Sequence, residues 1–262
     1  MTATTHALSD SATMLRRDLK HLIRYPSVTV MLIGMPVVFL LLFVYVLGGT
    51  LGHGLDGGGG RADYLAYVVP GILVITVCAV AQGTAISVAM DMTEGIIARF
   101  RTMAISRAAV LTGHVGGSMI QTALGLLAVT LVALVMGYRA PASAVQWLAV
   151  AAVLAMIAFA LTWLTVALGL ASSSVEAASN TPMFLILLPF LSSGFAPTDS
   201  MPPAVRWFAA HQPFTPFIDT VRGLLAGAPV GTSALATTIW CAAIAGGSYL
   251  WARSSYERRS LR

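Results

Sequence analysis

The residue types that most often do chemistry in proteins are few in this chain and widely spaced. Catalysis needs nucleophiles, acids, bases or metal ligands gathered in one place, and the sequence has no paired-Cys, His-x-x-x-His or Asp-rich motif. Cys78 and Cys241 both lie in long apolar runs, so we expect small packing residues there rather than a disulfide or a metal pair. His114 and Ser118 stand at i and i+4, and we expect a packing or helix-end role for them. The sequence therefore predicts neither a catalytic nor a metal site.

The chain also lacks the residues that would couple transport to an energy source. Transporters driven by protons or sodium usually keep an ionisable residue at mid-membrane, but the acidic residues here lie in loops, tails or at the edges of apolar runs. No phosphate-binding Gly-x-x-x-x-Gly-Lys-Ser/Thr loop is present, and the single lysine, Lys20, has no glycine near it. We therefore expect no cofactor on this chain; energy for transport comes from a separate subunit, where ATP and Mg would bind, or none is used.

The elements that carry these residues are predicted to be membrane-spanning helices. Hydrophobic residues make up 57% of the chain and charged residues 10%, whereas a soluble domain carries about 25% charged residues. A bilayer core needs about 20 predominantly apolar residues per helix. We predict an all-α integral membrane protein, a single transmembrane domain over residues 1–262, with six spans at residues 28–47, 65–89, 110–136, 145–170, 181–196 and 233–251.

The basic residues predict the orientation. Most of them flank the apolar runs on the side that holds both ends of the chain; the other side holds only Arg61, Arg139, Arg206 and Arg222. The positive-inside rule then places both termini in the cytoplasm of a bacterial inner membrane. The net charge of +5 is matched by anionic membrane lipid and predicts no nucleic-acid partner.

Two segments on the cytoplasmic side have an amphipathic pattern. Residues 9–25 place leucines on one helical face and Arg16, Arg17 and Lys20 on the other, which predicts an interfacial elbow helix or, alternatively, a plain topogenic anchor. Residues 94–107 form an apolar stripe that includes Ile97 and Phe100, with charged residues off it. This stripe predicts a docking helix for a partner or, alternatively, a helix lying on lipid.

A third segment, residues 197–231, is predicted to be external. Pro202-Pro203 indicates one short helix through residue 210, and Thr215 as a cap before Pro216 indicates another through residue 225 that ends at Gly227. Asp219 and Arg222 lie one turn apart and predict an ion pair. We expect a hairpin of helices that dips into the outer interface; simple loop packing is the alternative.

Three stretches resemble the type-2 ABC exporter permeases, and among them the daunorubicin-permease-like group. They are the loop sequence EGIIARFRTMAISR at residues 94–107, the stretch SGFAPT through Met201-Pro202 at residues 193–202, and HQPFTP at residues 211–216 followed by Asp219, Arg222 and Gly223. The resemblance covers nearly the whole chain. Ala104 departs from it, because these sequences commonly have proline there.

The resemblance implies a dimer of two six-span subunits paired with two copies of an ATPase. It implies a coupling helix that contacts the ATPase, with the residues Glu94, Gly95, Ile97, Phe100 and Arg101. It also implies that spans two and five line the export path. The candidate path residues are Thr76, Gln82 and Thr84 on span two, and Phe184, Leu188 and Ser192 on span five. The three on span five stand at i, i+4 and i+8, so we expect them on one helical face. Ordinary helix packing is the alternative to a role in the path.

These observations predict the membrane permease of an ATP-driven exporter, acting as a homodimer on an amphipathic small molecule such as an antibiotic. The alternatives are a polysaccharide or glycolipid permease of the same fold and a membrane assembly subunit that transports nothing. A membrane enzyme would need a polar cluster that the sequence does not contain.

Overall fold

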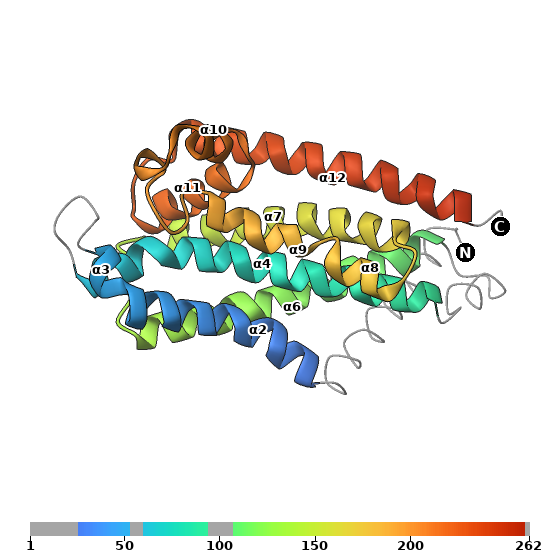
Figure 1. Cartoon of the computed structure of the whole chain (residues 1–262), viewed down its shortest axis with the longest axis horizontal. Coiled ribbons are helices and arrows are strands. Elements are labelled where there is room, and N and C mark those ends of the chain that lie inside the picture. Colours follow the sequence, from blue (N-terminus) through green and yellow to red (C-terminus); the bar gives the residue numbers. More distant parts are fainter. Residues whose placement is uncertain (1–25, 53–59, 94–106, 260–262) are drawn as a thin grey trace.

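The computed structural model describes residues 26–52, 60–93 and 107–259, and these residues form helices and their connections without any strand (Figure 1). The predicted elbow helix and the predicted coupling helix lie outside the described residues, apart from Arg107 at the start of α6. Both therefore stay predictions.

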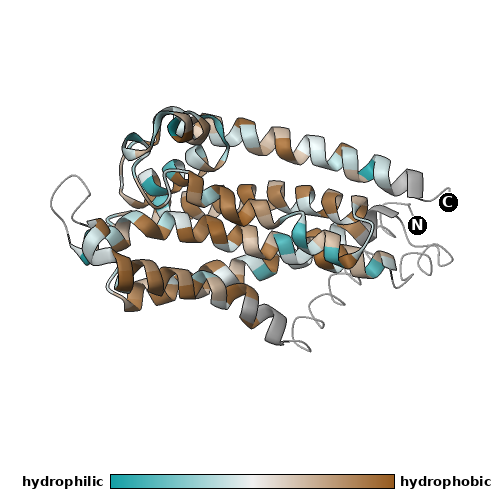
Figure 2. Ribbon diagram, in the orientation of Figure 1, coloured by the Kyte–Doolittle hydropathy of each residue, from teal (hydrophilic) through white to brown (hydrophobic). Residues whose placement is uncertain are grey.

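Five long apolar helices make up the bundle and coincide with five of the predicted spans. The first begins as α2 (Pro26–Leu41) and continues through η1 (Leu42–Leu47) and α3 (Gly48–Gly52). The others are α4 (Arg61–Thr93), α6 (Arg107–Val135), α7 (Ala144–Ala171) and α12 (Gly231–Arg259). Each is long and apolar enough to cross a membrane, and hydrophobic residues follow much of the length of α2, α4, α6 and α7 (Figure 2).

The predicted fifth span is divided into short pieces. The apolar stretch Val175–Leu191 consists of α8 (Val175–Asn180), α9 (Met183–Leu187) and the 3₁₀ turn η2 (Leu188–Leu191), after which Ser192 is extended. Proline has no backbone N–H and disrupts the α-helical ladder, which explains the tightened turn at Pro189. The expectation that Phe184, Leu188 and Ser192 share one helical face is wrong, because the helix ends before Ser192.

Short helices connect this break to the last long helix, as the sequence predicted. They are η3 (Thr198–Ser200), α10 (Pro203–His211) and α11 (Phe214–Leu225). The predicted cap at Thr215 is wrong, because α11 already begins at Phe214 and the Thr215 hydroxyl instead donates to the carbonyl of Ala209 at 2.6 Å. Gly227 ends the turn with a φ of +68°, a conformation that glycine adopts without steric cost.

Different helices lie at the two ends of the bundle (Figure 1). The α11 end holds α3, α10 and α11. The opposite end, here called the α8 end, holds α8, the last turn of α4 and the first turn of α6. The first turn of α2 and the last turn of α12 also lie toward the α8 end, so the described ends of the chain are on one side of the bundle (Figure 1).

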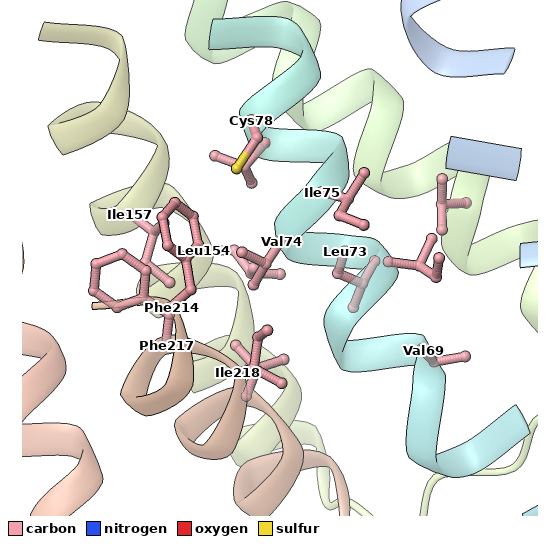
Figure 3. Close-up of a cluster of buried hydrophobic side chains, with 14 of the residues drawn as sticks. Val69, Leu73, Val74, Ile75, Cys78, Leu154, Ile157, Phe214, Phe217 and Ile218 are labelled. Atoms are coloured by element: carbon pink, nitrogen blue, oxygen red, sulfur yellow. The ribbon is translucent and has the colours of Figure 1, made fainter. Parts of the chain in front are cut away.

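The helix α4 is the centre of the bundle. It contacts α2, α6, α7, α8 and α11, and its residues from Val68 to Ala81 are all buried. Figure 3 shows its middle turns packed against Leu154 and Ile157 of α7 and against Phe214, Phe217 and Ile218 of α11. Cys78 lies in this core with its side chain fully buried and its thiol free, as predicted for a packing residue.

Close backbone contact holds α4 against α7. A Cβ atom on Gly169 of α7 would lie only 2.6 Å from the carbonyl oxygen of Ala85 on α4. Small residues allow helices in membranes to approach this closely, and the contacts then gain from van der Waals packing rather than from the hydrophobic effect. The position of α4 in the bundle therefore depends on the absence of a side chain at Gly169.

Candidate functional site

The predicted external ion pair forms the centre of a larger polar cluster at the α11 end. Nη1 of Arg222 lies 2.8 Å from Oδ1 of Asp219, both on α11. The same carboxylate oxygen accepts a hydrogen bond from the Ser193 hydroxyl at 2.6 Å. The guanidinium of Arg222 lies 4.2 Å from the centre of the Tyr67 ring on α4, within the range of a cation–π interaction. We call Tyr67, Ser193, Asp219 and Arg222 the Arg222 cluster.

The Arg222 cluster holds the backbone where the fifth apolar segment unwinds. The Ser193 carbonyl accepts hydrogen bonds from Nη2 of Arg222 at 2.6 Å and from the Tyr67 hydroxyl at 2.8 Å. Nη2 of Arg222 also donates to the Tyr67 carbonyl at 3.4 Å. Three elements far apart in the sequence, α4, the break after η2 and α11, are thereby joined at one carbonyl group.

Two other side chains also form hydrogen bonds with this break. Gln212, between α10 and α11, donates from Nε2 to the carbonyls of Leu188 and Leu191, each at 3.3 Å. The Ser192 hydroxyl donates to the Pro189 carbonyl at 2.5 Å and accepts from the Gly194 amide at 3.2 Å. Non-helical backbone at membrane depth is tolerated only where protein or water satisfies its polar groups. These hydrogen bonds therefore stabilise the unwound backbone as part of the fold.

Glycine allows the unwound chain to lie directly on α4. A Cβ atom on Gly71 of α4 would lie 3.0 Å from the carbonyl oxygen of Gly194. Four phenylalanine rings flank the same contact: Phe190 and Phe195 stack with their centroids 4.6 Å apart, and Phe39 and Phe43 of the first long helix lie against them. The aromatic rings join the first long helix to the break.

The candidate path residues on α4 are mostly enclosed within the single chain. Thr76 is fully buried and its hydroxyl donates to the Ile72 carbonyl of its own helix at 2.8 Å. Thr84 is buried and donates in the same way to Val80 at 3.3 Å. Gln82 is half-buried and its amide donates to the Ser179 carbonyl of α8 at 2.8 Å, which ties α4 to the divided segment.

The candidate path residues on the divided segment lie in three different environments. Phe184 is 44% exposed on α9, Leu188 is half-buried at the start of η2, and Ser192 is fully buried. The structure thus brings Gln82 and α8 together, but it does not bring the six candidates onto one surface. Their role in a path stays a prediction.

Tyr67, Ser193 and Gln212 were missed as functional residues in the sequence. The sequence signals were the serine pair and glycine after Pro189, which indicate a break, and a tyrosine within an otherwise apolar span. Neither signal identifies the partners of these side chains, because the Tyr67 hydroxyl of α4 and the Arg222 guanidinium of α11 meet at a Ser193 carbonyl that lies on neither helix.

In the part of the chain that the structure describes, long apolar helices pack around α4 together with a divided segment, an arrangement typical of a polytopic membrane protein. The sequence comparisons agree. Residues 11–226 match the ABC-2 type transporter family, and the chain belongs to this family.

Two relatives have names that describe their roles. The chain is 27% identical over 222 residues to the daunorubicin resistance ABC transporter permease protein DrrB1 of Streptomyces coeruleorubidus, an alignment covering 84% of this chain and 76% of that one. It is 30% identical over 222 residues to the probable doxorubicin resistance ABC transporter permease protein DrrC of Mycobacterium tuberculosis, covering 79% of this chain and 75% of that one. The predicted family is thereby confirmed.

Proposed function

We propose that this chain is the membrane permease subunit of an ATP-driven exporter that moves an amphipathic, largely apolar small molecule such as an antibiotic out of the cell. The observation that carries the proposal is the family membership, together with two relatives that are both named as drug-resistance ABC transporter permeases. The alternative substrates, a polysaccharide or a glycolipid, have no such support.

The distribution of charge in the structure supports an energy source outside this chain. Among the described residues, the acidic and basic side chains of the five long helices lie near helix ends, for example Asp63 and Asp91 in α4 and Arg253 in α12. A bundle without an ionisable residue at mid-membrane has nothing to couple to an ion gradient. The proposed partner is an ABC ATPase subunit that binds ATP and Mg.

We place the α8 end in the cytoplasm. The support is the sequence count of basic residues, which favours the side of both chain ends, and the position of the described ends of α2 and α12 toward this end. The end of α4 and the start of α6, which precede and follow residues 94–106 in the sequence, both lie at the α8 end, as the proposed contact of residues 94–107 with the ATPase requires.

The transporter is proposed to contain two copies of this chain. Large apolar side chains are exposed on several long helices and on α9, where Met183, Phe184 and Leu187 are between 44% and 53% exposed. Lipid covers part of this surface, and a second copy covers the part that encloses the path. ATP-driven closure of the ATPases then shifts the paired bundles as rigid bodies about that path.

The proposal is tested by purifying the tagged chain together with the ABC ATPase of its own transporter. We expect a stable complex of two permease and two ATPase chains whose ATP hydrolysis rises when doxorubicin is added. A complex whose hydrolysis responds to a glycolipid and not to the drug would favour the alternative substrate. A chain that binds no ATPase would refute the exporter assignment and favour an assembly subunit.

A further inference from the structure

The α8 end of the bundle holds a buried polar contact between α4 and α6. Nε2 of His114 on α6 lies 3.1 Å from Oδ2 of Asp91 on α4, with the His114 side chain 6% exposed and the Asp91 side chain 13% exposed. Asp91 is in the last turn of α4, and His114 is near the beginning of α6. The contact therefore joins the two helices that are connected by residues 94–106.

This contact lies at the edge of a second apolar cluster, separate from the main core. Val88 of α4 belongs to this cluster and precedes Asp91 by one turn. Leu111 and Val115 of α6 also belong to it and flank His114. The remaining members come from α7 and α12: Trp163, Val166, Ala167, Leu170 and Ala252. One turn further along α6, the Ser118 hydroxyl lies 3.2 Å from the Thr162 hydroxyl of α7. A single face of α6 thus makes polar contacts with α4 and then with α7.

An acid and a histidine at this position need not add stability. Removing a charged or polar pair from solvent is costly, and well-packed apolar side chains of similar volume often hold two helices equally well. What a pair of polar partners adds is a preferred alignment of the two helices, because sliding one helix along the other breaks the 3.1 Å contact. The contact fixes how the last turn of α4 lies against the first turns of α6.

We propose that Asp91 and His114 are a positioning pair for energy coupling. By holding the end of α4 to the start of α6, the pair makes the two helices move as one body when the ATPase displaces the residues between them. The inference rests on the proposed function. Since α4 lies at the centre of the bundle and contacts α2, α6, α7 and α8, a displacement of its end is passed to the whole bundle; without the pair, the two helix ends shift independently.

The test compares ATP hydrolysis with drug transport in proteoliposomes that contain the chain and its ATPase. The variants are Asp91→Leu, His114→Leu and the exchanged double variant Asp91→His with His114→Asp. Ser87→Ala is the matched control, because Ser87 lies one turn before Asp91 on α4, is exposed, and donates only to the Gly83 carbonyl of its own helix at 3.1 Å.

We expect each single variant to retain the ATPase and to hydrolyse ATP, but to transport about tenfold less doxorubicin per ATP, within the roughly 5- to 150-fold range of coupling between distant sites. The exchanged variant restores most of the ratio, and Ser87→Ala keeps it unchanged. The inference is overturned if the single variants transport as much doxorubicin per ATP as the wild type. That outcome includes a proportional fall of transport and hydrolysis, which a purely structural role predicts. If the wild-type chain binds no ATPase and transports no drug, the proposed function itself fails.

Discussion

Replacing Arg222 with methionine tests whether the Arg222 cluster holds the divided segment. Methionine keeps much of the length and apolar volume of arginine but cannot donate a hydrogen bond. The substitution removes the donor to the Ser193 carbonyl at 2.6 Å, the ion pair to Asp219 at 2.8 Å and the cation on the Tyr67 ring. The Ser193 carbonyl keeps only the Tyr67 hydroxyl as a side-chain donor.

The magnitude follows from how exposed each contact is. A charge-assisted hydrogen bond to a buried carbonyl contributes about 1.5–3 kcal/mol. The ion pair contributes less, about 0.2–1 kcal/mol, because solvent screens it; the Asp219 side chain is 36% exposed and the Arg222 side chain 22%. The cation–π contact adds about 0.5–1 kcal/mol. Because one guanidinium makes all three contacts, they are not independent, and we expect a loss of roughly 2–4 kcal/mol.

The assay is thermal unfolding of the purified chain in detergent. For a chain of this size, about 1 kcal/mol shifts the melting temperature by roughly 2–4 °C, so we expect Arg222→Met to melt roughly 5–15 °C below the wild type. The matched control is Arg139→Met, because Arg139 is exposed and donates only to the nearby carbonyls of Leu134 and Tyr138; we expect a change below about 0.5 kcal/mol there. Equal melting temperatures for the two variants would refute the reasoning.

Three further predictions follow from the packing and from the sequence. Gly169→Ala should cost about 1–3 kcal/mol by overpacking, since its Cβ meets the Ala85 carbonyl at 2.6 Å, whereas Gly34→Ala, with nothing within 4 Å, should not lower the melting temperature; similar values for both would argue against the close α4–α7 contact. Gln212→Met should change stability by less than about 1 kcal/mol, because it removes two long 3.3 Å hydrogen bonds but also the buried Oε1 that has no partner; a loss of several kcal/mol, measured by the same unfolding assay, would contradict this balance. Glu94→Arg combined with Phe100→Asp should abolish co-purification with the ATPase while membrane insertion stays normal, and unchanged binding would show that residues 94–107 are not the docking element.

Much of the architecture could be predicted from the sequence because membrane spans are set by length and composition. Five apolar runs became long helices, and Pro202-Pro203 and Gly227 marked the short helices α10 and α11 within a residue or two. The Asp219–Arg222 pair was predictable because i, i+3 residues are neighbours on any helix. These signals are local, so they do not depend on how the helices pack.

The remaining features depend on contacts that no local pattern contains. The helix α11 begins at Phe214, directly after Pro213 and before the predicted cap Thr215. The turn that contains Pro189 ends at Leu191, so the helical face expected to include Ser192 does not reach it. The π-helical turn η1 (Leu42–Leu47) lies within the first long helix, and the uninterrupted apolar run there gives no local signal for it. The role of Tyr67 depends on α4, the break and α11 meeting at the Ser193 carbonyl, which is a property of the packed bundle.

The most direct test of the central claim is ATP-driven drug uptake into inverted membrane vesicles that contain this chain and its ATPase. We predict that doxorubicin accumulates inside the vesicles when MgATP is added, and that accumulation is lost when the ATPase carries an inactivating substitution in its phosphate-binding loop. Accumulation that needs no ATP, or vesicles that take up no drug although the complex is assembled, would contradict the assignment of this chain as the permease of a drug exporter.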